Sequence, residues 1–78
     1  MITSNQIRMA RALLKWTVDD LSNRTNIPWA RIQFLEKAEI LLDSHREKVE
    51  IIKKVFEKEG VVFIDEVDNL SETIKMKK

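Results

Sequence analysis

The sequence predicts a mainly α-helical domain in which four helices are followed by a short C-terminal β segment. Apolar residues recur at helical spacing through most of the chain, and residues that cap helices divide this pattern into segments. A β-branched and aromatic run then follows the only glycine of the sequence. The 78 residues correspond to one domain, so residues 1–78 are expected to fold as a single unit.

The first helix is indicated by Thr3 and Gln6, which have the spacing of a capping box. Ile7 and Ala10 share one face of this helix and are expected to be buried. Trp16 follows the helix, and we expect it in the core because large aromatic side chains dominate small cores.

Two short helices joined by a tight turn are predicted over about residues 17–38. Thr17 is suited to cap the first of them, and the two aspartates that follow complement the positive end of its dipole. Asn26 is a residue type that ends helices in the left-handed conformation, and Pro28 suits the first turn of the next helix. This arrangement is a helix-turn-helix.

A fourth helix is predicted to begin at a second capping box formed by Ser44 and Glu47. Gly60 stands where a C-terminal cap belongs. Apolar residues between these two points recur at helical spacing and are expected to face inward. They are Val49, Ile52, Val55 and Phe56.

The C-terminal segment, residues 61–78, begins with a run that predicts a strand, and residues 65–69 are typical of a turn. Residues 73–77 alternate as an exposed edge strand would. A short helix with Val67, Leu70 and Ile74 on one face explains the same segment equally well. The first strand is expected to pair either with this segment or with its copy in a homodimer.

The small size of the chain also favours a partner. A domain of this length buries only about 60% of its unfolded surface and is marginally stable alone. The sequence has no cysteine and one histidine, which excludes a disulfide and leaves no ligand set for structural zinc. We therefore expect close helix packing, a homodimer, or both. The candidate dimer contacts are Val61, Val62, Phe63 and Ile64.

No feature of the sequence indicates catalysis. A glycine-rich phosphate loop and a cysteine nucleophile are missing, and the single histidine, His45, has no triad partners in evidence. We expect no enzymatic activity, no cofactor and no metal. No apolar run approaches the roughly 18 residues that span a bilayer, and no signal-peptide pattern precedes Gln6, so a cytoplasmic protein without membrane contact is expected.

Charge is distributed unevenly although the net charge is only +1. Up to Ala38 the chain carries six basic and three acidic residues, whereas the remainder carries eight basic and ten acidic ones. A polyanion would therefore be met by the N-terminal half.

Four segments resemble Xre-type, lambda-repressor-like DNA-binding domains. Gln6–Thr17 looks like their first helix and lead-in, Leu21–Ile27 like the second helix and turn, and Ile32–Lys37 like the end of the recognition helix. Gly60–Asp65 resembles the ending of a bacterial subgroup of short regulators. The resemblance covers about residues 4–65, and its strength lies in the order and spacing of the four segments.

This resemblance implies a cytoplasmic, sequence-specific transcriptional regulator that binds double-stranded DNA as a homodimer, with the third helix in the major groove. Arg11 and Glu36 match a structural ion pair between the first and third helices. Thr17 and Lys37 match positions that meet phosphates. The positions that face the bases match Trp29, Ala30 and Phe34, flanked by Arg31 and Gln33.

The chain departs from the family at the same positions. Val18 replaces a glutamine that often grips the phosphate backbone, and Pro28 replaces a Ser or Thr cap. Trp29, Ala30 and Phe34 are apolar where Gln, Asn or Arg would read bases. Trp29 and Phe34 are either buried in the domain or form an exposed contact surface. An alternative function is therefore a protein-interaction module, of an accessory or anti-repressor type, that uses this surface; one half of an antitoxin-like pair is a further option.

Overall fold

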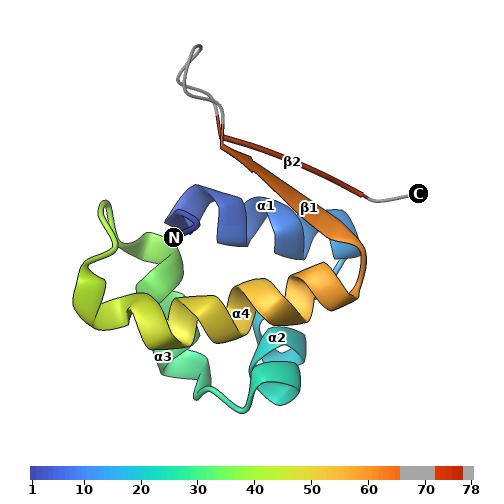
Figure 1. Cartoon of the computed structure of the whole chain (residues 1–78). Coiled ribbons are helices and arrows are strands. Elements are labelled where there is room, and N and C mark those ends of the chain that lie inside the picture. The colour runs from blue at the N-terminus through green and yellow to red at the C-terminus, as the bar shows by residue number, and fades with distance from the viewer. Residues whose placement is uncertain (66–71, 77–78) are drawn as a thin grey trace.

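A computed structural model of the protein describes residues 1–65 and 72–76 (Figure 1). Its helices are α1 (Ser4–Leu14), α2 (Val18–Thr25), α3 (Trp29–Lys37) and α4 (Arg46–Lys58), and a 3₁₀ turn, η1 (Asp43–His45), precedes α4. Two strands follow, β1 (Val61–Asp65) and β2 (Glu72–Met76). The predicted fold class, mainly α-helical with a C-terminal β segment, is confirmed.

The predicted caps at the ends of the first helices are present. Thr3 Oγ1 accepts a hydrogen bond from the N–H of Gln6 at 3.2 Å, and Gln6 Oε1 accepts one from the N–H of Thr3 at 3.0 Å. Asn26 ends α2 in the left-handed conformation at φ 64°, and Gly60 follows α4 at φ 98°. Helix boundaries that depend on neighbouring residues therefore lie close to where the sequence predicts them.

The predicted capping box at Ser44 is wrong. The structure has a 3₁₀ turn there, and α4 begins only at Arg46 without a side-chain cap. The turn is closed instead by His45, whose Nδ1 accepts a hydrogen bond from the N–H of Leu42 at 3.0 Å. Arg46 Nε also bonds Asp43 Oδ1 at 2.8 Å, so both side chains that close the segment lie outside the predicted pair.

Residues 72–76 pair as a strand, and the helical alternative is wrong for Ile74, which lies in β2. β1 and β2 are antiparallel, with Val61 opposite Met76 and Phe63 opposite Ile74. The turn predicted over residues 65–69 lies outside the described residues, except that Asp65 belongs to β1. Figure 1 shows the hairpin extending from the end of α4 and lying over α1, which β2 contacts.

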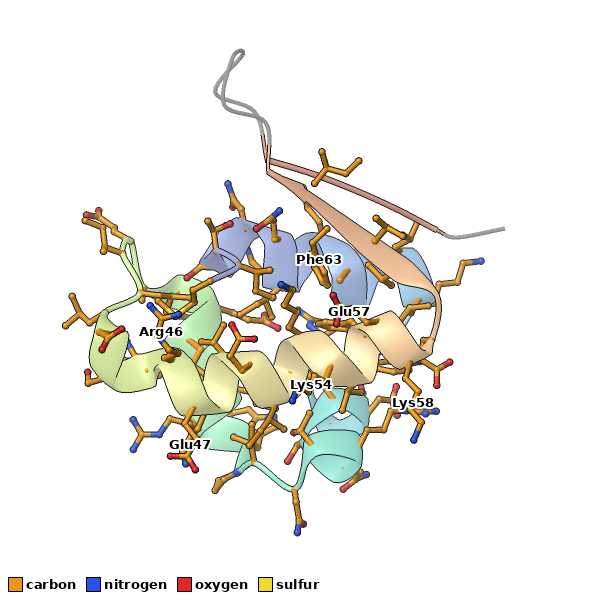
Figure 2. The ribbon with its side chains drawn as sticks, in the orientation of Figure 1. Arg46, Glu47, Lys54, Glu57, Lys58 and Phe63 are labelled. Atoms are coloured by element: carbon orange, nitrogen blue, oxygen red, sulfur yellow. The ribbon has the colours of Figure 1, made fainter. Side chains whose placement is uncertain are left out.

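The core lies between the four helices and β1. Phe56 of α4 is fully buried at its centre, and its ring centroid lies 5.7 Å from that of the stacked Trp16 ring and 6.1 Å from that of Phe63. Figure 2 shows Phe63 pointing from β1 toward the helices. Trp16 is half-buried and packs against the core, as predicted. The buried apolar residues are Ile2, Ile7, Ala10, Leu21, Ile27, Ile32, Leu35, Val49, Ile52, Phe56 and Val61.

Candidate nucleic-acid interface

The helix-turn-helix is formed by α2, α3 and the turn between them, and α2 begins at a capping box. Thr17 Oγ1 accepts from the N–H of Asp20 at 3.0 Å, and Asp20 Oδ2 accepts from the N–H of Thr17 at 2.9 Å. The bond from the Thr17 N–H, with a further contribution from the Thr17 side chain, lowers the pKa of the Asp20 carboxyl below its ordinary value. The Thr17 hydroxyl is exposed, but its primary role in the structure is to hold the first turn of α2.

Side-chain hydroxyls fix the turn between the two helices. Ser22 Oγ donates to the carbonyl of Ile27 at 2.6 Å, and Thr25 Oγ1 donates to the carbonyl of Leu21 at 2.8 Å. The Thr25 hydroxyl also accepts from the N–H of Ile27 at 3.2 Å. Together with the left-handed Asn26, these bonds set the angle at which α3 leaves α2. Neither hydroxyl was predicted to act here, although Ser and Thr near a turn are residue types that make such bonds.

Helix α3 has one buried face and one exposed face. Ile32, Leu35 and Glu36 are buried against the other helices. The opposite face carries most of the predicted DNA-contacting residues. Trp29, Ala30, Arg31, Phe34 and Lys37 are exposed, and Gln33 is half-buried at the edge.

The predicted ion pair between Arg11 and Glu36 is present and joins α1 to α3. Arg11 Nε lies 2.8 Å from Glu36 Oε2, and Arg11 Nη2 lies 3.0 Å from Glu36 Oε1, so the pair is bidentate. The third nitrogen of Arg11 donates to the carbonyl of Trp16 at 3.0 Å. Bonding to the buried Glu36 carboxylate raises the pKa of the Arg11 guanidinium above its ordinary value. The bidentate pair therefore fixes α3 against α1.

Two further side chains of α1 hold the C-terminal end of α3. Ser4 Oγ donates to the carbonyl of Leu35 at 2.6 Å. Arg8 donates to the carbonyl of Glu36 and to Asn5 Oδ1. The last carbonyls of a helix have no partner within the helix, so these bonds satisfy groups that otherwise need water. The end of α3 is thus held by side chains from a different helix.

The exposed face of α3 is dominated by two aromatic side chains. Trp29 is 49% exposed and Phe34 is 48% exposed, so the interpretation that both are buried in the core is wrong. The centroids of the His45 and Phe34 rings lie 5.4 Å apart in a T-shaped arrangement, and the Arg31 guanidinium lies 5.9 Å from the centre of the Phe34 ring. A hollow of about 290 Å³ beside Phe34 is lined by Pro28, Ala30, Arg31 and Phe34. We call these four residues the α3 notch.

A second hollow, of about 300 Å³, lies between α3 and the start of α4. It is lined by Arg31 and Leu35 on one side and by Ser44, His45, Glu47 and Lys48 on the other. Figure 2 shows Glu47 on the side of α4 that is turned toward α3. Arg31, Lys48 and the Ser44 hydroxyl are groups that bind a phosphate. The negative charge of Glu47 would repel a phosphate at the same place. Sequence patterns did not predict a shared site here, because these residues come together only across the segment between α3 and α4.

The predicted dimer contacts are divided by the structure. Val61 is 2% exposed within the core of its own chain, and Phe63 packs against that core. Val62 and Ile64 alternate with them along β1, so their side chains lie on the opposite face of the strand. Only these two of the four predicted residues are placed where a second copy of the chain would meet them.

Scans of known family models, curated proteins and solved structures find no match to this chain. Within residues 1–65 and 72–76, no helix has the length and apolar character needed to cross a membrane. In the same part of the chain, no group of three or more His, Cys, Asp and Glu side chains is placed to hold a metal ion. The geometry of α3 and its neighbours is therefore the basis for a functional proposal.

Proposed function

We propose that the protein is a DNA-binding transcriptional regulator that docks α3 in the major groove of double-stranded DNA. The observation that carries this proposal is that α3 has one face fixed against the domain and one face exposed. Its inner face is held by the bidentate Arg11–Glu36 pair, whereas its outer face is left exposed beside a helix-turn-helix turn. An α-helix fits the width of the major groove, so a rigidly held, exposed helix is the element that such docking needs. A regulator of this type acts in the cytoplasm.

The residues of the exposed face divide by role. Arg31 and Lys37 supply positive charge at the two ends of the exposed face and would meet phosphates or base acceptors. Glu36 does not oppose them, because Arg11 neutralises it. Gln33 adds an amide at the edge, and Thr17 lies at the start of α2, where its backbone would approach the phosphate backbone.

Homodimer formation completes this proposal. Helix α3 has only nine residues, so one copy reads few base pairs, and two copies would read two half-sites about one helical turn apart. Val62 and Ile64 form an apolar outer face on β1 and are the contacts that we propose for the second copy.

A second candidate function is binding of a protein partner through the same face. Trp29 and Phe34 favour it, since exposed aromatic side chains usually mark contact surfaces. The two candidates differ in their response to salt. Contacts with phosphates release counterions and weaken steeply as salt rises, whereas apolar contacts with a protein do not.

Fluorescence anisotropy with a pool of labelled duplexes across a salt series tests the proposal. We expect binding whose affinity falls as salt rises, and a doubly substituted Arg31→Glu, Lys37→Glu protein that no longer binds. A doubly substituted Lys54→Glu, Lys58→Glu protein is the matched control, because it changes the net charge by the same amount at two exposed lysines of α4. An absence of binding even at low salt would overturn the DNA-binding proposal and favour the protein-binding candidate.

A further inference from the structure

The α3 notch is apolar where a DNA-reading helix normally carries amides. Ala30 and Phe34 form its apolar wall, Pro28 closes one end, and Arg31 is the only charged residue that lines it. Gln33, the one amide in α3, lies half-buried at the edge of the exposed face. The centre of this face therefore has no Asn or Gln side chain that could recognise adenine by hydrogen bonds.

Phe34, in the wall of the notch, has two ring contacts with neighbouring side chains, and its helix is joined to α1 by an ion pair. The His45 and Phe34 rings are T-shaped, with centroids 5.4 Å apart, and the Arg31 guanidinium lies 5.9 Å from the centre of the Phe34 ring. The Arg11–Glu36 pair fixes the helix that carries them. A side chain that is fixed before binding loses little conformational entropy on contact, so the notch is suited to selective contact rather than to loose adhesion.

The major groove offers one apolar group among its base edges, which is the C5 methyl of thymine. Resting on the DNA-binding function proposed above, we propose that the α3 notch reads thymine through this methyl group. The methyl packs against Ala30 and Phe34, and Arg31 at the rim bonds a neighbouring phosphate or guanine. The target half-site accordingly contains thymine at the positions that face Ala30 and Phe34, and the chain selects it by shape rather than by amide hydrogen bonds.

Replacement of thymine by deoxyuridine tests this inference, because uracil keeps every hydrogen-bonding group and loses only the methyl. A high-affinity duplex is first selected from a random library with the full chain, and each thymine is then replaced in turn. Removal of one buried methyl is expected to weaken binding about fourfold. We expect this loss at one or two thymines in each half-site, and an almost unchanged affinity when any other thymine is replaced.

Variants of the protein assign the effect to the notch. Phe34→Ala is expected to bind the thymine and uracil duplexes with nearly equal affinity, and its exposed position means that the fold is retained. Lys37→Ala is the matched control, because loss of a phosphate contact weakens binding to both duplexes by the same factor and preserves their ratio.

The outcomes separate this inference from the function on which it rests. Tight binding of the selected duplex with no discrimination against uracil overturns the thymine inference and leaves DNA binding intact. Discrimination that persists unchanged in Phe34→Ala also overturns it, since the methyl would then be read elsewhere. Failure to enrich any duplex overturns the DNA-binding proposal itself, and the thymine inference with it.

Discussion

Arg11 is the residue that does most to position α3. It gives two hydrogen bonds to Glu36 and one to the carbonyl of Trp16, and Glu36 is 5% exposed. Arg11→Met would leave that carboxylate at a buried position without its two hydrogen bonds from Arg11. We expect the free energy of unfolding to fall by about 2 kcal/mol, less than for a fully buried pair because Arg11 is partly exposed. Urea unfolding followed by circular dichroism measures this loss.

The control for Arg11 is Arg46→Met, which removes an exposed ion pair with Asp43. Exposed pairs contribute little, so its effect is expected to stay below about 0.5 kcal/mol. Similar losses in the two variants would contradict the special role of the Arg11–Glu36 pair.

Lys15 is strained by its backbone conformation. It ends α1 in the left-handed region at φ 59°, where a side chain with a Cβ atom is disfavoured and glycine is not. We expect Lys15→Gly to raise the free energy of unfolding by about 0.5–1 kcal/mol. The midpoint of urea unfolding reports the change. Lys15→Ala keeps the Cβ atom and removes the charge, so a gain of the same size in this variant would assign the effect to charge instead.

At the scale of the element, α2 depends on a capping box that titrates. The pKa of Asp20 is lowered in the fold because its carboxylate accepts from the Thr17 N–H, with a further contribution from the Thr17 hydroxyl. A lowered folded-state pKa contributes stability above the unfolded value of about 4, and this contribution is lost as pH falls through the folded-state pKa. We expect Asp20→Asn to reduce the fall in stability between about pH 4 and pH 2.

Unfolding by urea at a series of pH values measures this difference. Asp19→Asn is the matched control, because it removes the same charge from the same turn of α2. If the two variants lose stability in parallel as pH falls, the contribution comes from charge near the helix end rather than from the capping box.

The elements show why part of the structure could be predicted from sequence. Thr3, Thr17 and Asn26 contact backbone groups within four positions along the chain, so a short stretch of sequence is enough to predict their roles. The bonds from Ser4 and Arg8 to α3 carbonyls join residues about 30 positions apart, and no local pattern records them.

The errors and gaps of prediction have the same physical origin. The Ser44–Glu47 pair has the spacing of a capping box, but in the structure His45 closes a 3₁₀ turn there by accepting from the N–H of Leu42. Whether Trp29 and Phe34 were buried depended on how much core the helices already held, which spacing alone does not give. The Arg11–Glu36 pair was anticipated only through the family resemblance, since its two residues are 25 positions apart.

At the scale of the whole molecule, one face of β1 packs on the core and the other is the face proposed to contact a second copy of the chain. The inner residues of β1, Val61 and Phe63, complete the core of one chain, and Val62 and Ile64 face outward. Under the proposed homodimer, Val62→Lys is expected to shift the protein from dimer to monomer without unfolding it, because a charge at the contact would lose its water on association. Sedimentation velocity measures the shift. Lys58→Glu is the control, because it changes a charge away from β1 and is expected to leave the dimer intact. A monomeric unsubstituted protein would contradict the dimer.

The two tryptophans of the chain occupy opposite environments, and this has a consequence for spectroscopy. Trp16 stacks on Phe56 with the Arg24 guanidinium 4.2 Å from its ring, whereas Trp29 stands half in solvent on the face proposed to bind. Their emission therefore reports separate events, with Trp16 sensitive to unfolding and Trp29 to docking. A Trp16→Phe protein carries a single fluorophore at the contact surface, and its quenching by iodide would distinguish a free α3 from an occupied one without any label.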